Sequence, residues 1–318
     1  MANKVAQGEK NTVSHGSPLP PQLQFGDRTF VKLGAVAVLV LLVLVFFMSW
    51  GSGADDPPPS GRWQPKRTGV DCSSSCDGKE RFVIITIATD ERVPYRCQSI
   101  HNKRMYAQRH GYDFVALTRT LEPSRPAHWS KLLAVQQILY PLGQQALSRY
   151  DWAWLVDLDT VIMTPRLKLE DIIVEARKLA SNPETMDIVI SKDCNSYNSG
   201  SFFLRRSPFV QRFLQQVWHL NNASEVRNLV KWKEQASIIH ALEKVSNATE
   251  NRKHAQLVPQ KLLNAYAKEV RCGYVWHEGD LLLHVPGRAA STKANLMKQW
   301  GDLAEYWNPP GPGGPTSC

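Results

Sequence analysis

Alternating apolar and polar segments predict a sheet whose strands are connected by helices. The run Arg81–Thr89 is rich in β-branched residues and predicts a buried strand, and a second strand is expected over Tyr112–Thr118. Between them the pattern predicts a helix over Pro94–His110 that ends at Gly111. Strands and helices that alternate with short connections are typical of a doubly wound α/β sheet.

The same pattern continues through the rest of the chain. Further helices are expected at Trp129–Tyr140, Leu169–Leu179, Pro208–Trp218 and within Val230–Ile239, and further strands at Asp187–Ser191 and within Glu278–Gly287. Residues Asn195–Arg205 predict a polar, glycine-containing loop that runs into a strand. We therefore expect one α/β domain over residues 81–307, with a mostly parallel, Rossmann-like sheet flanked by helices.

The stretch Asp151–Met163 carries the first candidate chemistry. It opens as an apolar strand and ends in Asp157-Leu158-Asp159. Alternate strand residues project to the same side, so the strand pattern places the two carboxylates together. Their repulsion is relieved by a divalent cation that also binds a phosphate. Open α/β sheets bind ligands at such strand ends, although a short Asp-x-Asp triplet alone is equally compatible with a solvated turn.

Other polar residues follow predicted strands or begin helices. Asn198 and Ser199 could bond a sugar, and Gly200 would permit close backbone approach, although an ordinary turn is the simpler interpretation. Glu234 and Gln235 lie in the first turn of a predicted helix, where the helix dipole alone favours a carboxylate. His284 follows a predicted strand. The chain has neither a dinucleotide-binding glycine fingerprint nor a P-loop, so a metal ion would have to hold any phosphate.

The first eighty residues predict a membrane-anchored protein. Leu33–Ala54 carries no charge, and its twenty-two residues would form a helix of about 33 Å, enough to cross a bilayer. Residues 1–32 hold four basic and two acidic residues, so the positive-inside rule places them in the cytoplasm. We expect a type II signal anchor at 33–54, a stem at 55–80, a lumenal domain, and a disordered tail at 308–318.

Cysteines, sequons and charge agree with a lumenal domain. All six cysteines follow the anchor, as do the acceptor sequons at Asn222 and Asn247. Cys72 and Cys76 could close a small loop, but the disulfide connectivity stays open. The net charge of +9 favours polyanionic partners. Lumenal placement excludes nucleic acid and leaves nucleotide diphosphates or anionic glycans.

Six elements in fixed order resemble glycosyltransferase family 34, the fungal α-galactosyl- and α-mannosyltransferases and plant xyloglucan xylosyltransferases. The elements are Trp129-x-Lys131, the Asp157-x-Asp159 strand, Asn198–Arg205, Glu234-Gln235, Val258–Tyr266 and Gly279-Asp-x-x-x-His284-x-x-Gly287. The resemblance covers residues 82–300. It implies a GT-A fold and a retaining transferase in the Golgi membrane that uses Mn²⁺ and a nucleotide-sugar donor, with galactose from UDP-galactose or mannose from GDP-mannose favoured over xylose.

Residue roles follow from the resemblance alone. It implies that Asp157, Asp159 and His284 bind the metal, that Asp157 also contacts the donor, and that Glu234 and Gln235 flank the anomeric carbon. It further implies donor contacts from Lys131, Asn198, Ser199, Gly200 and Gly287. The run His284-Val-Pro-Gly-Arg288 departs from the family pattern, in which an aromatic follows the histidine and a cysteine follows the glycine. The cation that contacts the phosphate could therefore be Arg288 or Lys293.

Two other functions remain open from the sequence. A non-catalytic, membrane-tethered subunit or glycan-binding scaffold of a transferase complex would have the same anchor and domain. A lumenal phosphohydrolase would need further carboxylate or histidine ligands for a second metal ion, and the motifs supply none. The donor, the glycan acceptor and the linkage are not determined by the sequence.

Overall fold

The computed structural model describes residues 79–141, 148–220 and 233–309, which all fall within one compact unit. The predicted anchor at residues 33–54 lies outside them, together with the predicted cytoplasmic tail and nearly all of the predicted stem and C-terminal tail. Within the described ranges no helix is long and apolar enough to cross a bilayer.

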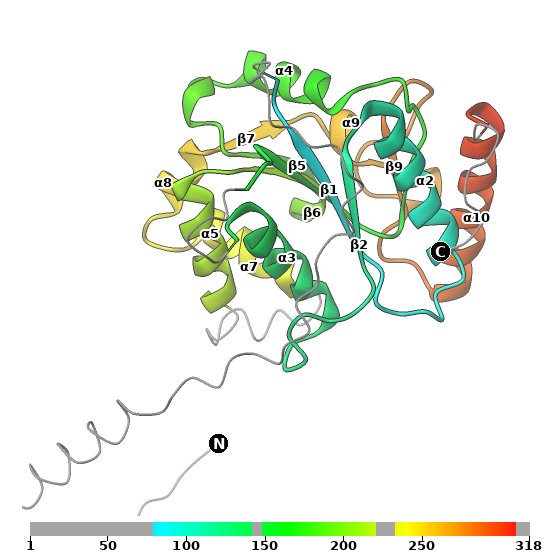
Figure 1. Ribbon diagram of the computed structural model, residues 1–318, viewed down its shortest axis with the longest axis horizontal. Coiled ribbons are helices and arrows are strands. Elements are labelled where there is room, and N and C mark those ends of the chain that lie inside the picture. The colour runs from blue at the N-terminus through cyan, green and yellow to red at the C-terminus, as the bar shows by residue number, and fades with distance from the viewer. Residues whose placement is uncertain (1–78, 142–147, 221–232, 310–318) are drawn as a thin grey trace, which may run out of the picture. The chain divides into compact units, whose positions relative to one another are not determined.

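A six-stranded sheet in the order β2-β1-β3-β6-β5-β7 forms the centre of the fold (Figure 1). β1 pairs in parallel with β2 and β3, and β5 pairs in parallel with β7. β6 runs antiparallel to both of its neighbours, so the sheet is mixed, while the other five strands run in one direction, as expected for a mostly parallel sheet. The strands are β1 (Phe82–Ile87), β2 (Asp113–Leu117), β3 (Trp152–Val156), β5 (Ile188–Asp193), β6 (Ser196–Arg205) and β7 (Ala255–Val258).

The reversed strand is the segment that we expected to begin as a loop. Ser196–Arg205 is one continuous strand that forms a hairpin with β5. Asp193 closes the turn by accepting a hydrogen bond from the backbone N–H of Asn195 at 2.6 Å, and Ser196 follows in the left-handed region at φ 89°. A hairpin makes its strands antiparallel, and the polar residues of this one are paired rather than exposed.

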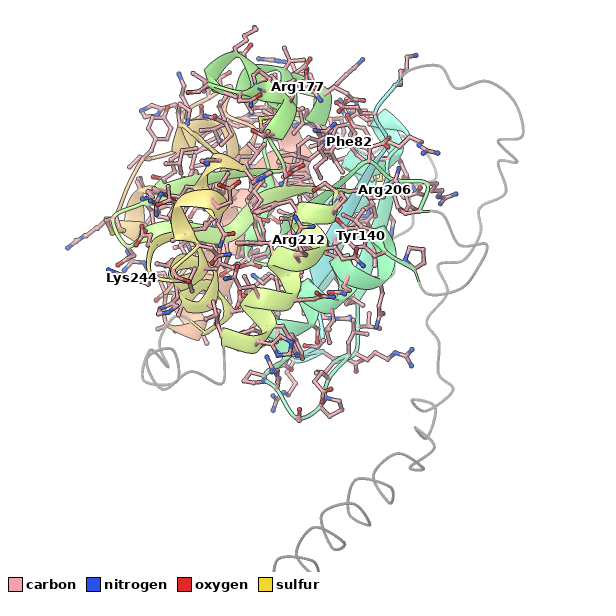
Figure 2. The ribbon with its side chains drawn as sticks, turned by 90° about the vertical axis from the view of Figure 1, so that its left-hand side faces the viewer. Phe82, Tyr140, Arg177, Arg206, Arg212 and Lys244 are labelled. Carbon is pink, nitrogen blue, oxygen red and sulfur yellow. A yellow bond between two sulfur atoms is a disulfide. The ribbon has the colours of Figure 1, made fainter. Side chains whose placement is uncertain are left out.

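Helices cover both faces of the central sheet. Along β1, Val83 and Ile85 face a core formed with α3 (Ser130–Leu139), α5 (Pro208–Leu220) and α7 (Lys233–Glu243). Phe82 and Ile84 face the opposite core, formed with α2 (Arg96–His110) and α4 (Leu169–Leu179). In Figure 2, Arg212 of α5 lies between Tyr140, which follows α3, and Lys244, which follows α7. The expected sheet flanked by helices is confirmed.

A second sheet, which we did not predict, lies beside the first. It has the order β4-β9-β8, with β4 at Thr160–Ile162, β9 at Leu282–His284 and β8 at Ala265–Tyr266. Helix α10 (Ala290–Trp307) packs on it through Leu296 and Met297. β9 lies within the strand expected over Glu278–Gly287, but β4 and β8 have only three and two residues and carry too little periodicity to be detected in a sequence. Two further short α-helices of the described residues are α8 (Ala248–Lys253) and α9 (Gln260–Leu263).

The chain passes from one sheet to the other at the acidic triplet. β3 ends at Val156, residues 157–159 form a turn, and β4 begins at Thr160. The Thr160 hydroxyl closes this turn by donating to the carbonyl oxygen of Asp157 at 2.6 Å. Asp157 and Asp159 are therefore not alternate residues of a strand, as the sequence suggested. They are brought together by a turn at the junction of two sheets.

Candidate metal and donor site

The carboxylates of Asp157 and Asp159 meet the imidazole of His284 at this junction. One potential ligand atom from each residue lies within 4.8 Å of those of the other two. The antiparallel pairing of β4 with β9 places Thr160 opposite His284 and brings His284 Nε2 within 3.2 Å of Asp159 Oδ1. The backbone of Asp157 is fixed from the other sheet, where its N–H donates to the carbonyl of Gly200 at 2.8 Å.

The imidazole of His284 is buried and held in one orientation. Its Nδ1 lies 2.6 Å from Asn264 Oδ1, an atom that can only accept, so Nδ1–H donates a hydrogen bond there and Nε2 is the ring nitrogen that faces Asp159. Gly200 lies against the ring, because a Cβ atom at that position would stand 2.3 Å from His284 Cε1. The backbone of β6 can therefore approach the histidine only where residue 200 lacks a side chain.

Lys131 joins the acidic turn to α7. Its Nζ lies 2.9 Å from Asp157 Oδ1 and 2.6 Å from Glu234 Oε1, and its side chain is only 4% exposed. Burial alone would lower the pKa of Lys131, but these two carboxylates raise it above its ordinary value. Lys131 is therefore a fixed positive charge beside Asp157. Glu234 is buried behind it, with His128 Nε2 3.6 Å from its other oxygen.

The two aspartates have pKa values displaced in opposite directions. Burial raises the pKa of the Asp157 carboxyl, and repulsion from Asp159 and Glu234 adds to this against the attraction of Lys131. Burial would also raise the pKa of Asp159, but His284 and Lys293 lower it well below its ordinary value. Asp159 therefore remains ionised beside two nitrogen-bearing side chains.

The polar residues at the start of β6 form two sets of hydrogen bonds, one with Gln235 and one with Asp193 and Tyr266. Ser199 N–H donates to Gln235 Oε1 at 3.0 Å. Asn198 Oδ1 accepts from the N–H of Gly200, while its Nδ2 donates to Asp193 Oδ2 at 2.7 Å. Tyr266 lies within hydrogen-bonding distance of Asn198 and Asp193. Asn198, Ser199 and Gly200 are thus packed against the acidic site, and only Gln235 of the Glu234–Gln235 pair is partly exposed.

The two candidate cations after β9 are placed differently. Lys293, near the start of α10, forms an ion pair with Asp159. Arg288 instead donates to the carbonyl oxygen of Glu269. Gly287 occupies a left-handed turn at φ 63°, which glycine adopts without strain. Among the described residues, Lys293 therefore reaches the acidic pair and Arg288 does not.

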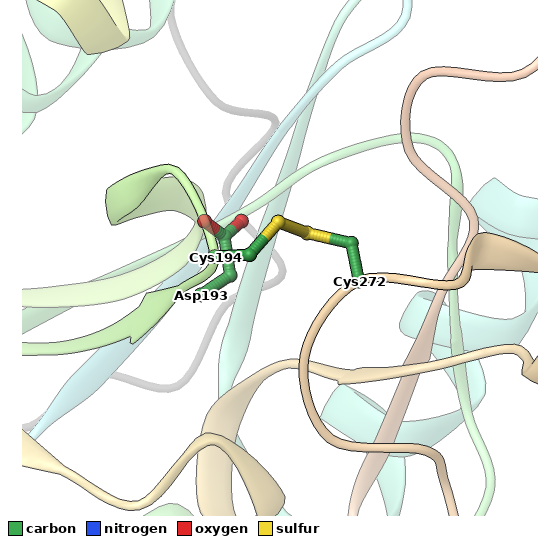
Figure 3. A group of neighbouring side chains, drawn as sticks. All are labelled: Asp193, Cys194 and Cys272. Carbon is green, nitrogen blue, oxygen red and sulfur yellow. A yellow bond between two sulfur atoms is a disulfide. The ribbon is translucent and has the colours of Figure 1, made fainter.

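A disulfide connects the β5–β6 turn to the loop that precedes β9. Cys194 is bonded to Cys272, and Figure 3 shows Asp193 beside this bridge. These three residues are close enough to suggest metal ligands, but sulfurs in a disulfide cannot bind a metal as thiolates. The bridge covalently joins the segments that carry Asn198 and His284. Its connectivity was not predictable from the sequence.

Several residues around the site were missed by sequence reasoning. Lys103 of α2 is fully buried, with Nζ 2.7 Å from Ser99 Oγ and 2.9 Å from the carbonyl oxygen of Thr160. Nothing in the sequence distinguishes this lysine from the exposed ones. Asn264 and Tyr266 had a signal, because both lie in the Val258–Tyr266 element, to which we assigned no role.

The buried amine of Lys103 predicts a specific pH dependence of stability. Burial lowers its pKa from 10.5 to about 7, against the attraction of Asp159 and Asp157. Between these values the unfolded chain binds more protons, so stability rises with pH. In metal-free buffer, the unfolding free energy of the wild-type protein minus that of Lys103→Met should increase by about 2 kcal/mol between pH 7 and pH 9. Urea titrations check this, and parallel pH profiles would contradict it.

The donor atoms present suit a hard divalent cation. Two carboxylates and one imidazole match the ligand preferences of Mn²⁺ better than those of metals that favour thiolates. The orientation of His284 by Asn264 is the kind of outer hydrogen bond that metal-binding histidines have. The residues therefore fit a metal site, with Asp157, Asp159 and His284 as candidate ligands.

The fold resembles that of a solved glycosyltransferase. The crystal structure of a glycosyltransferase involved in glycosylation of the major capsid of PBCV-1 matches with a TM-score of 0.53 and 16% sequence identity. The match covers 69% of this chain and 99% of that one. At this level of identity the likeness concerns the fold alone.

Two curated relatives come from yeasts. An uncharacterized alpha-1,2-galactosyltransferase of Schizosaccharomyces pombe is 26% identical over 222 residues, which are 59% of this chain and 62% of that protein. The probable alpha-1,6-mannosyltransferase MNN10 of Saccharomyces cerevisiae is 26% identical over 242 residues, which are 65% of this chain and 58% of that protein. The chain thus spans less than two thirds of the length of either relative.

A family model matches most of the region that carries the fold and the site. Its two matches cover residues 78–183 and 175–293, which include the acidic turn, Lys131, Glu234, His284 and Lys293. The resemblance inferred from the six sequence elements is confirmed. The chain belongs to the galactosyl transferase GMA12/MNN10 family.

Proposed function

We propose that this protein transfers a hexosyl group, galactose or mannose, from a nucleotide-sugar donor to a glycan acceptor, with retention of the anomeric configuration. The cluster of Asp157, Asp159 and His284 within 4.8 Å carries this proposal, in a chain that belongs to a transferase family. The choice of hexose is supported by relatives named as alpha-galactosyl- and alpha-mannosyltransferases.

Mn²⁺ is the proposed cofactor. When bound, it would supply Lewis-acid neutralisation of the diphosphate that leaves the sugar. Lys131 pairs with Asp157 and Lys293 pairs with Asp159, and both would add positive charge for the same phosphates. Because phosphates carry their own negative charge, Lys293 could exchange its contact with Asp159 for a donor oxygen.

The remaining residues have roles that their contacts suggest. Gln235, partly exposed and bonded to Ser199, is better placed than Glu234 to reach the sugar. Glu234 is bonded to Lys131 and buried, so its proposed role is to hold Lys131 in place. Asn198 and Ser199 would hold the β6 backbone in position beside the site through their hydrogen bonds. Gly287 forms the turn that follows His284.

The function is tested by assaying the purified full-length chain with UDP-galactose, GDP-mannose and UDP-xylose. We expect one hexose donor to be hydrolysed, and transferred to an oligosaccharide, with Mn²⁺ but not with EDTA. Asp159→Asn removes a ligand charge with little change in volume and should lower the rate by at least about a hundredfold.

Two outcomes would contradict the proposal in different ways. Full activity of a folded Asp159→Asn protein would show that the metal assignment is wrong. A wild-type protein that neither binds nor turns over any of the donors would instead favour the non-catalytic subunit.

The proposed location is the Golgi membrane, with the anchor at residues 33–54 and the domain in the lumen. Supporting features are the apolar run and the flanking charge of the sequence. Asn247 lies exposed between α7 and α8, where a glycan could be attached. Endoglycosidase-sensitive modification of Asn247 checks the lumenal placement.

A further inference from the structure

The backbone on both sides of Asp159 is held by side chains of α2. Ser99 Oγ donates to the carbonyl oxygen of Leu158 at 2.5 Å, and Lys103 Nζ donates to that of Thr160 at 2.9 Å. Two residues further along β4, Asn102 accepts from the N–H of Ile162 and donates to its carbonyl oxygen. These contacts fall on alternate residues of the chain, as a neighbouring strand's would.

Helix α2 thereby completes the edge of β4 that no strand of the described residues covers. The other edge of β4 pairs with β9, which carries His284. The acidic turn is therefore fixed between a strand that supplies a proposed ligand and a helix that supplies none. A displacement of Thr160 would move Asp159, its immediate neighbour, relative to the imidazole 3.2 Å away.

Lys103 is the central member of this helix contact. Its side chain has no exposed surface, and its described hydrogen bonds go to Ser99 and Thr160 rather than to a carboxylate. Lysine is rarely buried without a charged partner. Burial lowers the pKa of this amine to about 7, so the neutral form predominates at pH 8. A neutral amine has two N–H groups, which match the two acceptors, Ser99 Oγ and the carbonyl oxygen of Thr160.

We propose that Lys103 is a positioning residue for the metal centre, acting through the carbonyl oxygen of Thr160 and, by way of Ser99, that of Leu158. The inference rests on the proposed Mn²⁺ site. The described hydrogen bonds of Lys103 reach none of the proposed metal ligands. Its role is to hold the turn in the geometry that lets Asp157, Asp159 and His284 bind one ion together.

The test is Mn²⁺ binding by the purified full-length Lys103→Met protein at pH 8, measured by electron paramagnetic resonance. Methionine keeps an unbranched side chain of similar length but cannot donate to Thr160. Loss of partners that orient ligands typically weakens metal binding by about 10–100-fold, and we expect a Kd increase in this range. The spectrum of the bound ion should also broaden as its coordination becomes less uniform.

Lys298→Met is the matched control, because Lys298 is exposed on α10 and pairs with Asp302. It should bind Mn²⁺ with the wild-type Kd and spectrum. Ser99→Ala serves if Lys103→Met fails to fold, since it removes one bond to the turn from a helical position that tolerates alanine. Its Kd should rise several-fold.

The outcomes separate this inference from the proposed function. If the wild-type protein binds no Mn²⁺, the metal site itself is wrong. If it binds Mn²⁺ and a folded Lys103→Met protein has the same or a lower Kd with an unchanged spectrum, only the positioning role is wrong. A wild-type Kd for Ser99→Ala has the same meaning when Lys103→Met does not fold.

Discussion

Lys131→Met is expected to lower the free energy of unfolding by about 3–5 kcal/mol, the range found when one partner of a buried ion pair is removed. Lys131 is the counter-charge for Asp157 and Glu234 at 2.9 and 2.6 Å. Without it, the buried Glu234 carboxylate loses its ammonium partner and keeps the neighbouring charge of Asp157. The substitution leaves the length of the side chain nearly unchanged, so lost packing contributes little.

Urea denaturation of the two proteins at pH 7.5 measures this loss. The Lys131→Met/Glu234→Gln double variant should recover at least half of it, because a neutral amide at position 234 no longer needs a buried counter-charge. Lys298→Met, which removes an exposed lysine, should leave the unfolding transition unchanged. If Lys131→Met is as stable as wild type, the ion pairs with Asp157 and Glu234 do not stabilise the fold.

The larger elements of this fold could be predicted because their patterns are long. The strand at Arg81–Thr89, the helix that ends before Gly111 and the helix at Leu169–Leu179 all correspond to observed elements with small changes at their ends. β6 was mistaken in part for a loop because its first residues are polar. Their partners are the turn at Asp193 and the residues of α7, which no local pattern reveals.

The candidate site was found for a reason that was only partly right. Asp157 and Asp159 do lie together, but a turn between two sheets brings them there, not the alternation of one strand. The choice between Arg288 and Lys293 depended on how α10 packs, which the sequence does not specify. Lys103 could not be identified at all, since a buried lysine differs from an exposed one only in tertiary structure.

Gly200→Ala is expected to raise the Kd for Mn²⁺ by at least about tenfold and to lower the rate of transfer in proportion. The new Cβ atom would stand 2.3 Å from His284 Cε1 and 2.9 Å from Asn198 Oδ1. The imidazole cannot turn aside freely, because it is buried and bonded to Asn264. The ring or the β6 backbone must therefore move. A moved ring separates His284 from Asp159, and a moved backbone displaces the Gly200 carbonyl oxygen that holds Asp157.

A thermodynamic cycle with His284→Ala tests whether the clash is with the imidazole. Gly200→Ala alone should lower the unfolding free energy by about 1–3 kcal/mol, as overpacking of a buried site does. In the His284→Ala background the added methyl group has room, so the same change should lower it by less than half as much. An equal loss in both backgrounds would instead attribute the strain to Asn198. Gly200 is not a proposed ligand, whereas His284 is. The Kd of the Gly200→Ala variant for Mn²⁺ therefore shows how closely β6 must approach His284 for the metal to bind.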